Sequence, residues 1–198
     1  MTTTTLTRKP TILTWQGVDA PRLESVRLLV AGVRFKTSGR LIAAATGDAD
    51  AYSTSFEAAT DEAGTFCRLL LRVTTAEEER QLSVNRTEDG LWLVDRGQGN
   101  ERSTFGGAFE VDVAGAVTFN AFPVRRLGLH REAGQHELPV VYVSLPDLNI
   151  RVSQQTYTTV SIGDDSAVVN YRDENFTADL TVDSEGFVID YPGLATRV

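Results

Sequence analysis

The chain has 198 residues, 41% of them hydrophobic, and its 27 acidic and 19 basic residues give a formal net charge of −8 at pH 7. This length suits one large β domain or two small ones. The acidic balance argues against a surface that coats nucleic acid or an anionic membrane, because phosphate binding needs clustered Lys and Arg. No window approaches the roughly 18 apolar residues of a spanning helix, and no signal-peptide pattern is present. Cys67 is the only cysteine. We therefore expect a cytoplasmic protein without integral membrane insertion.

Short strands and turns follow one another in the first half of the chain. Residues 1–14 are polar and rich in threonine, and we expect them to be a flexible lead-in to a single domain over residues 15–198. Ser38 and Gly39 predict a tight turn, and an alternation of apolar residues over 67–73 predicts a half-buried strand. The other predicted strands here are 24–30, 33–36, 40–45 and 52–58.

Two later segments, 81–94 and 179–189, have the same pattern. Each has a strand, an acidic turn closed by glycine and an apolar return strand, which predicts a β-hairpin. The similarity indicates either a weak internal duplication or only the turn chemistry that antiparallel hairpins share. A charged loop is expected at 131–138. Further strands are predicted at 109–113, 140–145, 148–152, 155–160, 168–172 and 187–191.

One segment, residues 118–129 with the sequence TFNAFPVRRLGL, has helical character. Asn120 can cap this helix, and Pro123 is tolerated in its first turn. Phe119, Phe122 and Leu127 can share one apolar side. About a dozen antiparallel strands with one helix predict a barrel or roll, since such a sheet removes its edges and buries the apolar side of the helix.

The charged residues leave several possibilities open. Arg125 and Arg126 leave the helix about 100° apart, and one that faces inward needs an acidic partner or a ligand. Asp112, Asp183 and Asp190 lie close to apolar strands and can pair with an arginine or serve acid–base chemistry. His130 and His136 are six residues apart in the charged loop, so we expect both to be solvated. No nucleotide, phosphate-loop or nucleophile-elbow motif is present. The sequence thus predicts no catalytic residue, metal site or cofactor.

Several ordered motifs in the second half are similar to those of one bacterial family. They are EVDV at 110–113, TFNAFPVRRL at 118–127, QTY at 155–157, YR at 171–172, LTVD at 180–183 and DYPG at 190–193. The chain resembles the glycolipid-binding family, formerly a domain of unknown function. In the first half only Trp15 and Trp92 fit the pattern. The resemblance implies a spiral antiparallel β-roll, barrel-like and mainly β, wrapped around one central α-helix.

The resulting functional hypothesis is a non-catalytic protein that binds a glycolipid, a lipid or another hydrophobic small molecule between the roll and the helix. The chain of the ligand would contact Phe122 and Leu127, and its head would lie near Gln155, Tyr157 and an arginine. The alternatives are an enzyme that acts on a lipid-like substrate in the same cavity, with Asp190 as a candidate base, and a fully packed core whose surface binds proteins. No nucleic-acid partner is expected, and the sequence does not determine the oligomeric state. The candidate ligand-binding residues are Asn120, Phe122, Arg125, Arg126, Leu127, Gln155, Tyr157 and Tyr191.

Overall fold

The computed structural model describes residues 10–47 and 49–198, which form one sheet of fifteen strands, two 3-10 helices and one α-helix. The helical elements are η1 (Phe105–Gly107), η2 (Val117–Asn120) and α1 (Ala121–Arg126). The strands are β1 (Thr11–Gly17), β2 (Arg22–Ala31), β3 (Arg34–Ala43), β4 (Tyr52–Thr60), β5 (Phe66–Thr74), β6 (Glu79–Arg86), β7 (Trp92–Asp95), β8 (Asn100–Ser103), β9 (Glu110–Val113), β10 (Gln135–Val143), β11 (Ile150–Ile162), β12 (Ser166–Arg172), β13 (Thr177–Asp183), β14 (Val188–Tyr191) and β15 (Ala195–Arg197).

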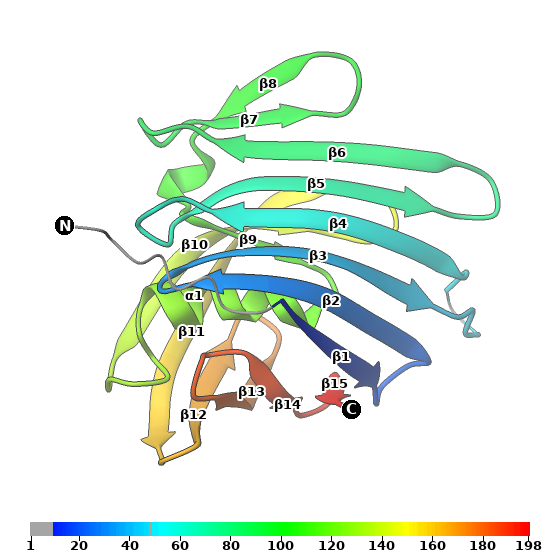
Figure 1. Ribbon diagram of the computed structural model, residues 1–198. Helices are drawn as coiled ribbons and strands as arrows, with labels where there is room; N and C mark the ends of the chain where they lie inside the picture. The colour runs from blue at the N-terminus through cyan, green and yellow to red at the C-terminus, as the bar shows by residue number, and fades with distance from the viewer. Residues whose placement is uncertain (1–9, 48) are drawn as a thin grey trace.

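The strand order is β8-β7-β6-β5-β4-β3-β2-β1-β15-β14-β13-β12-β11-β10-β9, so β1 and β15 meet in the middle of the sheet (Figure 1). Every neighbouring pair is antiparallel except β9 and β10, which are parallel. The predicted mainly β fold with one short helix is confirmed. The sheet is nevertheless open rather than closed, because β8 and β9 are its two edges.

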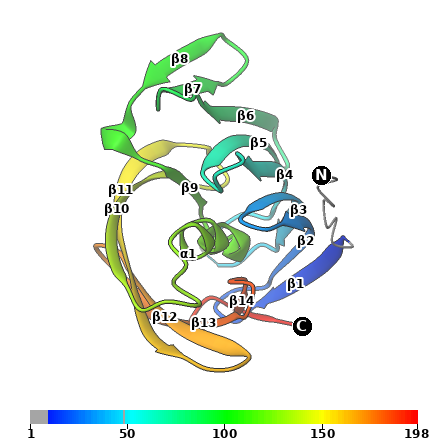
Figure 2. The ribbon, with the colours of Figure 1, turned by 60° about the vertical axis from the view of Figure 1, so that its left-hand side comes forward.

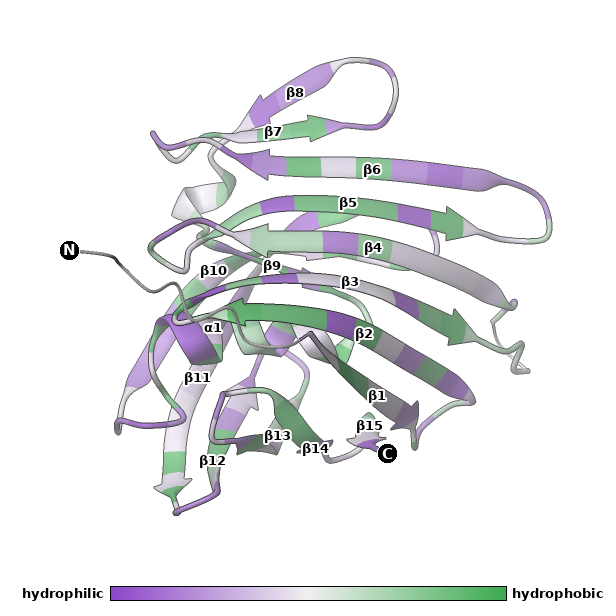
Figure 3. Ribbon diagram, in the orientation of Figure 1, coloured by the Kyte–Doolittle hydropathy of each residue, from purple (hydrophilic) through white to green (hydrophobic). Residues whose placement is uncertain are grey.

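The sheet curves around α1, which lies on its inner side (Figure 2). Phe122 of α1 is fully buried, and its ring centroid is 4.4 Å from that of Phe35 on β3 and 4.8 Å from that of Phe66 on β5. Buried and exposed positions alternate along β2 to β6, as a sheet with one buried face requires. Hydrophilic and hydrophobic residues are interspersed along these strands (Figure 3). The helix therefore supplies the core against which the inner face of the sheet packs.

The N-terminal half differs from prediction in two places. The strand β1 begins at Thr11, inside the expected lead-in, while residues 1–9 lie outside the described part of the chain. Ser38 and Gly39 do not form a turn but lie within the continuous strand β3, where Gly39 pairs with Val26 and Phe56. A Cβ atom on Gly39 would lie 2.6 Å from both of these side chains. This glycine therefore makes room for an aromatic ring across the sheet.

Both predicted hairpins are confirmed, as β6–β7 and β13–β14. The charged loop is shorter than predicted because residues 135–138 belong to β10, and the two strands expected over 148–160 are one strand, β11. Among residues 10–47 and 49–198, none of the helices has the length and apolar character needed to cross a bilayer.

Candidate functional site

A pocket of about 290 Å³ lies beside the start of the helical segment, where parts of the chain from residue 19 to residue 194 converge. Strand β9 and the turn after it form one wall, and the turns that follow β12 and β14 form another. Its lining is Asp19, Asp112, Val113, Ala114, Gly115, Ala116, Asn120, Tyr142, Tyr171, Asp173, Phe176, Tyr191, Gly193 and Leu194. No lysine, arginine or histidine is among these residues.

Aromatic rings form one side of the pocket. The rings of Tyr171, Phe176 and Tyr191 lie within 6.0–6.3 Å of one another, centroid to centroid. Tyr171 and Tyr191 are buried, whereas Phe176 is 41% exposed. The hydroxyl groups of Tyr142 and Tyr191 make no hydrogen bond to any described residue, so both can bond to a ligand. The pocket thus combines an exposed aromatic ring with available hydroxyl groups.

A buried hydrogen-bond network supports the pocket from behind. Gln155 Nε2 donates to Asp112 Oδ2 over 2.8 Å, and the Tyr157 hydroxyl lies 3.1 Å from Gln155 Oε1 and 3.2 Å from Asn120 Oδ1. Gln155 and Tyr157 are two residues apart on β11 and therefore point to the same face of the sheet. Both are 1% exposed, as befits positioning residues rather than ligand contacts. The network fixes the side chains of Asp112 and Asn120 at the pocket.

Carboxylates give the pocket an acidic character. Burial raises the pKa of Asp112 to about 6, although the hydrogen bond from Gln155 acts in the opposite direction. Asp173 accepts hydrogen bonds from the Tyr171 hydroxyl and from the backbone N–H groups of Asn175 and Phe176. Asp19 forms an ion pair with Arg22 over 2.8 Å. Such a pocket favours hydroxyl groups or a cation over an anion.

The comparisons with known proteins agree with this fold. A family model described as "Putative glycolipid-binding" matches residues 12–197. The chain belongs to this family. A crystal structure of a DUF1089 family protein from Pseudomonas aeruginosa superposes with a TM-score of 0.73 at 27% identity, covering 100% of this chain and 98% of that one. No curated protein matches the chain.

Five of the six motifs that resemble the glycolipid-binding family contribute to the pocket or to the network behind it, and LTVD does not. EVDV supplies Asp112, the helical motif supplies Asn120, YR supplies Tyr171 and DYPG supplies Tyr191, while QTY supplies the two residues behind them. Of the predicted site residues, the structure thus brings together Asn120, Gln155, Tyr157 and Tyr191.

The other four predicted residues lie elsewhere. Arg125 is buried; its guanidinium donates to the backbone carbonyl of Gly32 over 2.7 Å and to that of Glu185, and it lies over the rings of Phe35 and Phe187. Arg126 forms an ion pair with the buried Glu110. Neither arginine lines the pocket. The prediction that an inward-facing arginine pairs with an acid is confirmed only in part, because the ion-paired Arg126 side chain is 20% exposed.

The predicted contact between a ligand chain and the apolar side of the helix does not fit the packing. The side chains of Phe35 and Phe66 occupy the space beside Phe122, and Leu127 packs partly buried against the same core. His130 is another correction, since it is 6% exposed and packs near the Val124 carbonyl instead of being solvated. Burial lowers the pKa of His130.

Sequence reasoning missed two acidic residues of this region. Glu24 on β2 is 2% exposed and accepts hydrogen bonds from the backbone N–H groups of Val117, over 2.6 Å, and Thr118, over 3.2 Å. It thereby binds the first N–H groups of the helical segment, a role expected for Asn120. Asn120 itself has a helical backbone and makes no capping bond. Asp19 is the second, and its position just before β2 gave no signal in the sequence.

Proposed function

We propose that this chain is a non-catalytic binding protein for a glycolipid-like amphiphile, whose hydroxyl-rich head occupies the pocket at Asp112. The observation that carries the proposal is the exposed ring of Phe176 in the same pocket as the Asp112 carboxylate and two available tyrosine hydroxyls. A sugar presents C–H groups on one face and hydroxyl groups around its edge. An aromatic ring packs against the C–H face, and carboxylate and hydroxyl groups form hydrogen bonds with the sugar hydroxyls.

The size of the pocket limits what it can hold. Its volume of about 290 Å³ is at the lower end of the range of ligand pockets, roughly 300–1,000 Å³. A head group of one or two small rings fits this volume, but an acyl chain does not fit beside it. The chain of the ligand therefore leaves through the mouth of the pocket, along the exposed ring of Phe176.

Octyl glucoside, used below its micelle concentration, provides a direct test against octyl phosphate, which has the same chain. Isothermal titration should detect binding of the glucoside but not of the phosphate, since no basic residue lines the pocket and only Asp19 of its three carboxylates is ion-paired, to Arg22. Phe176→Ser should weaken glucoside binding. Phe109→Ser is the matched control, because Phe109 is 45% exposed and lies outside the pocket. Equal binding of the two detergents, or equal effects of the two variants, would contradict the proposal.

A second candidate is an enzyme that acts on a glycoside in the same pocket. Asp112 supports this candidate, because a carboxyl group with a pKa of about 6 can transfer a proton near neutral pH. Asp190, the base considered from the sequence, does not line the pocket. Incubation with nitrophenyl glycosides separates the two functions. Turnover that Asp112→Asn abolishes while octyl glucoside still binds would favour the enzyme.

A further inference from the structure

The outer face of β1–β5 carries basic and aliphatic side chains, although the chain as a whole is acidic. Its outward side chains form cross-strand rows, because the strands pair in register. One row contains Ser25, Arg40, Ser55 and Arg72, and the next contains Ile12, Arg27, Ser38, Glu57 and Leu70. The flanking rows are Leu29, Lys36, Ala59 and Arg68 on one side and Leu23, Ile42, Ser53 and Thr74 on the other. We call these four rows the cationic face.

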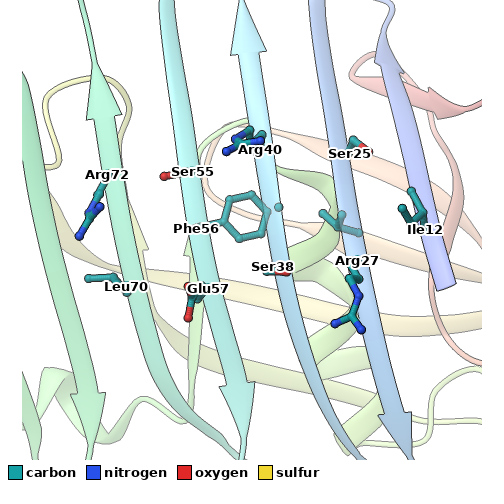
Figure 4. Close-up of a pocket in the computed structure, with 12 residues that line it drawn as sticks. Ile12, Ser25, Arg27, Ser38, Arg40, Ser55, Phe56, Glu57, Leu70 and Arg72 are labelled. Carbon is teal, nitrogen blue, oxygen red and sulfur yellow. The ribbon is translucent and has the colours of Figure 1, made fainter. Parts of the chain in front are cut away.

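Small residues between the long side chains hollow this face. A depression of about 500 Å³ lies over Ser25, Ser38 and Ser55, with Arg27, Arg40 and Arg72 around it (Figure 4). A second depression of about 340 Å³ adjoins it and adds Lys36 and Arg68. The charged ends of the arginine and lysine side chains therefore surround depressions whose bases are formed by small serine and alanine residues.

The charge of the cationic face is opposite to that of the whole chain. It carries five basic residues and a single acid, Glu57, although the net charge of the protein is −8. In the described part of the chain, the salt bridges involve other residues, and none of these five cations has an acidic partner within 4.0 Å. Arg72 Nε donates a hydrogen bond to Gln81 Oε1 over 3.1 Å, but the neutral amide does not cancel its charge. All five positive charges can therefore attract an external anion.

Large aliphatic side chains are exposed beside these charges. Ile12 is 67% exposed and Ile42 is 54% exposed, and Leu23 and Leu29 on β2 are 44% and 36% exposed. Exposed aliphatic residues among basic ones are typical of surfaces that lie in the interface of a bilayer.

We propose that the cationic face docks on the surface of a lipid bilayer that contains anionic phospholipids. Arg40 and Arg72 are two strands apart, roughly 10 Å between their backbones, and the other basic residues lie in neighbouring rows. The positive charges are therefore spread over several strands, and the head groups of a membrane likewise present many anions in one plane. The aliphatic side chains decide against nucleic acid, because a phosphate backbone offers them no apolar partner. A bilayer accommodates both kinds of side chain.

Sedimentation with vesicles tests this inference. The protein should bind vesicles of phosphatidylcholine mixed with phosphatidylglycerol but not vesicles of phosphatidylcholine alone. Binding should disappear near 1 M salt, where the screening length is about 3 Å. The double variant R40Q/R72Q should lower the partition coefficient roughly 30-fold, since each basic residue near an anionic surface contributes about a fivefold factor.

Two matched controls make the result specific. R131Q/R172Q removes the same charge from exposed arginines outside the cationic face and should leave binding nearly unchanged. Ile42→Ser should weaken binding more than Val160→Ser, although the two side chains are 54% and 55% exposed. Equal losses in both arginine variants, absence of binding to the mixed vesicles, or equally tight binding to a DNA duplex that R40Q/R72Q abolishes would overturn the proposal.

The vesicles contain no glycolipid, so this experiment does not depend on the pocket at Asp112. Phe176→Ser should bind the mixed vesicles like the wild type. If octyl glucoside fails to bind while the vesicle result holds, only the proposed function fails. If octyl glucoside binds while the protein does not bind the mixed vesicles, only the proposed membrane contact fails.

Discussion

At the scale of single residues, Tyr157 is a structural group rather than a ligand contact. Its hydroxyl lies within hydrogen-bond distance of Asn120 and Gln155, and the residue is 1% exposed. Burial raises its pKa well above the ordinary value, so the hydroxyl remains protonated and can donate. We expect Tyr157→Phe to destabilise the protein by about 1 kcal/mol, the contribution of one neutral hydrogen bond. Urea unfolding measures this loss. Octyl glucoside should bind the folded variant nearly as well, and a selective loss of affinity would instead indicate direct contact.

The sequence predicted which polar residues gather near the helix, but not which of them line the pocket. The alternation along β11 places Gln155 and Tyr157 on one inward face, and this follows from the two-residue period of a strand alone. The partners of Arg125 and Arg126 depended on chain segments up to 93 residues away. No local pattern specifies such contacts. A pocket assembled from residues 19 to 194 was outside the reach of sequence reasoning for the same reason.

Among the strands, Gly39 on β3 has no side chain and so leaves room for the ring of Phe56 on β4. We expect Gly39→Ala to destabilise the protein by about 1–3 kcal/mol, because the new methyl group would overlap Phe56 and Val26. Gly47→Ala is the matched control, since no atom lies within 4 Å of a Cβ atom there. Thermal unfolding of both variants measures the difference. Equal melting temperatures for Gly39→Ala and Gly47→Ala would show that the rings and side chains around Gly39 can move aside for the methyl group.

Glu24 makes the attachment of the helical segment sensitive to pH. Burial raises the pKa of Glu24 to about 8, although two backbone N–H groups lower it. A carboxyl group whose pKa rises on folding stabilises the fold fully below its unfolded value, and this stability is lost as the pH rises through about 8. We expect Glu24→Gln to lose less stability than the wild type between pH 5 and pH 9. Urea midpoints at the two values measure it.

Two other carboxyl groups act in the same direction, since burial raises the pKa of Glu110 to about 7 and that of Asp112 to about 6. Glu24→Gln should therefore remove most of the pH dependence between pH 7 and pH 9, whereas below pH 6 the variant should still lose stability through Glu110 and Asp112. A variant whose stability falls as steeply as that of the wild type above pH 7 would show that Glu24 does not cause the loss.

Arg126 ties the helix to the edge strand β9 through Glu110, which is 1% exposed. Replacing Arg126 by methionine leaves this acid unpaired, and we expect a loss of roughly 3–5 kcal/mol. The loss should be smaller at pH 6 than at pH 9, because Glu110 can then take up a proton. The double variant E110L/R126M should recover part of the stability. If Arg126→Met unfolds like the wild type at both pH values, the ion pair contributes little.

The composition gives the net charge of the protein but not where the charged residues lie on its surface. The net charge argued against an anionic membrane as partner, yet five basic residues collect on one face of β1–β5 because the strand register aligns them. The hairpins were predictable from alternation and turn residues, since both signals are local. The pairing of β1 with β15 was not predictable, because no short-range pattern joins residues some 180 positions apart.

The last strand holds the two halves of the sheet together. β15 lies between β14 and β1, and Trp15 on β1 also donates a hydrogen bond to the Val188 carbonyl. A chain that ends at Leu194 lacks β15 and should lose several backbone hydrogen bonds of about 1 kcal/mol each, a large part of a typical stability of roughly 5–15 kcal/mol. Hydrogen exchange should then show β1 and β14 opening first. A chain that ends at Arg197 loses only the bond from Val198 to Thr14 and should remain stable. Equal urea midpoints for the two truncated chains would mean that core packing around the helix, rather than strand pairing, joins the halves.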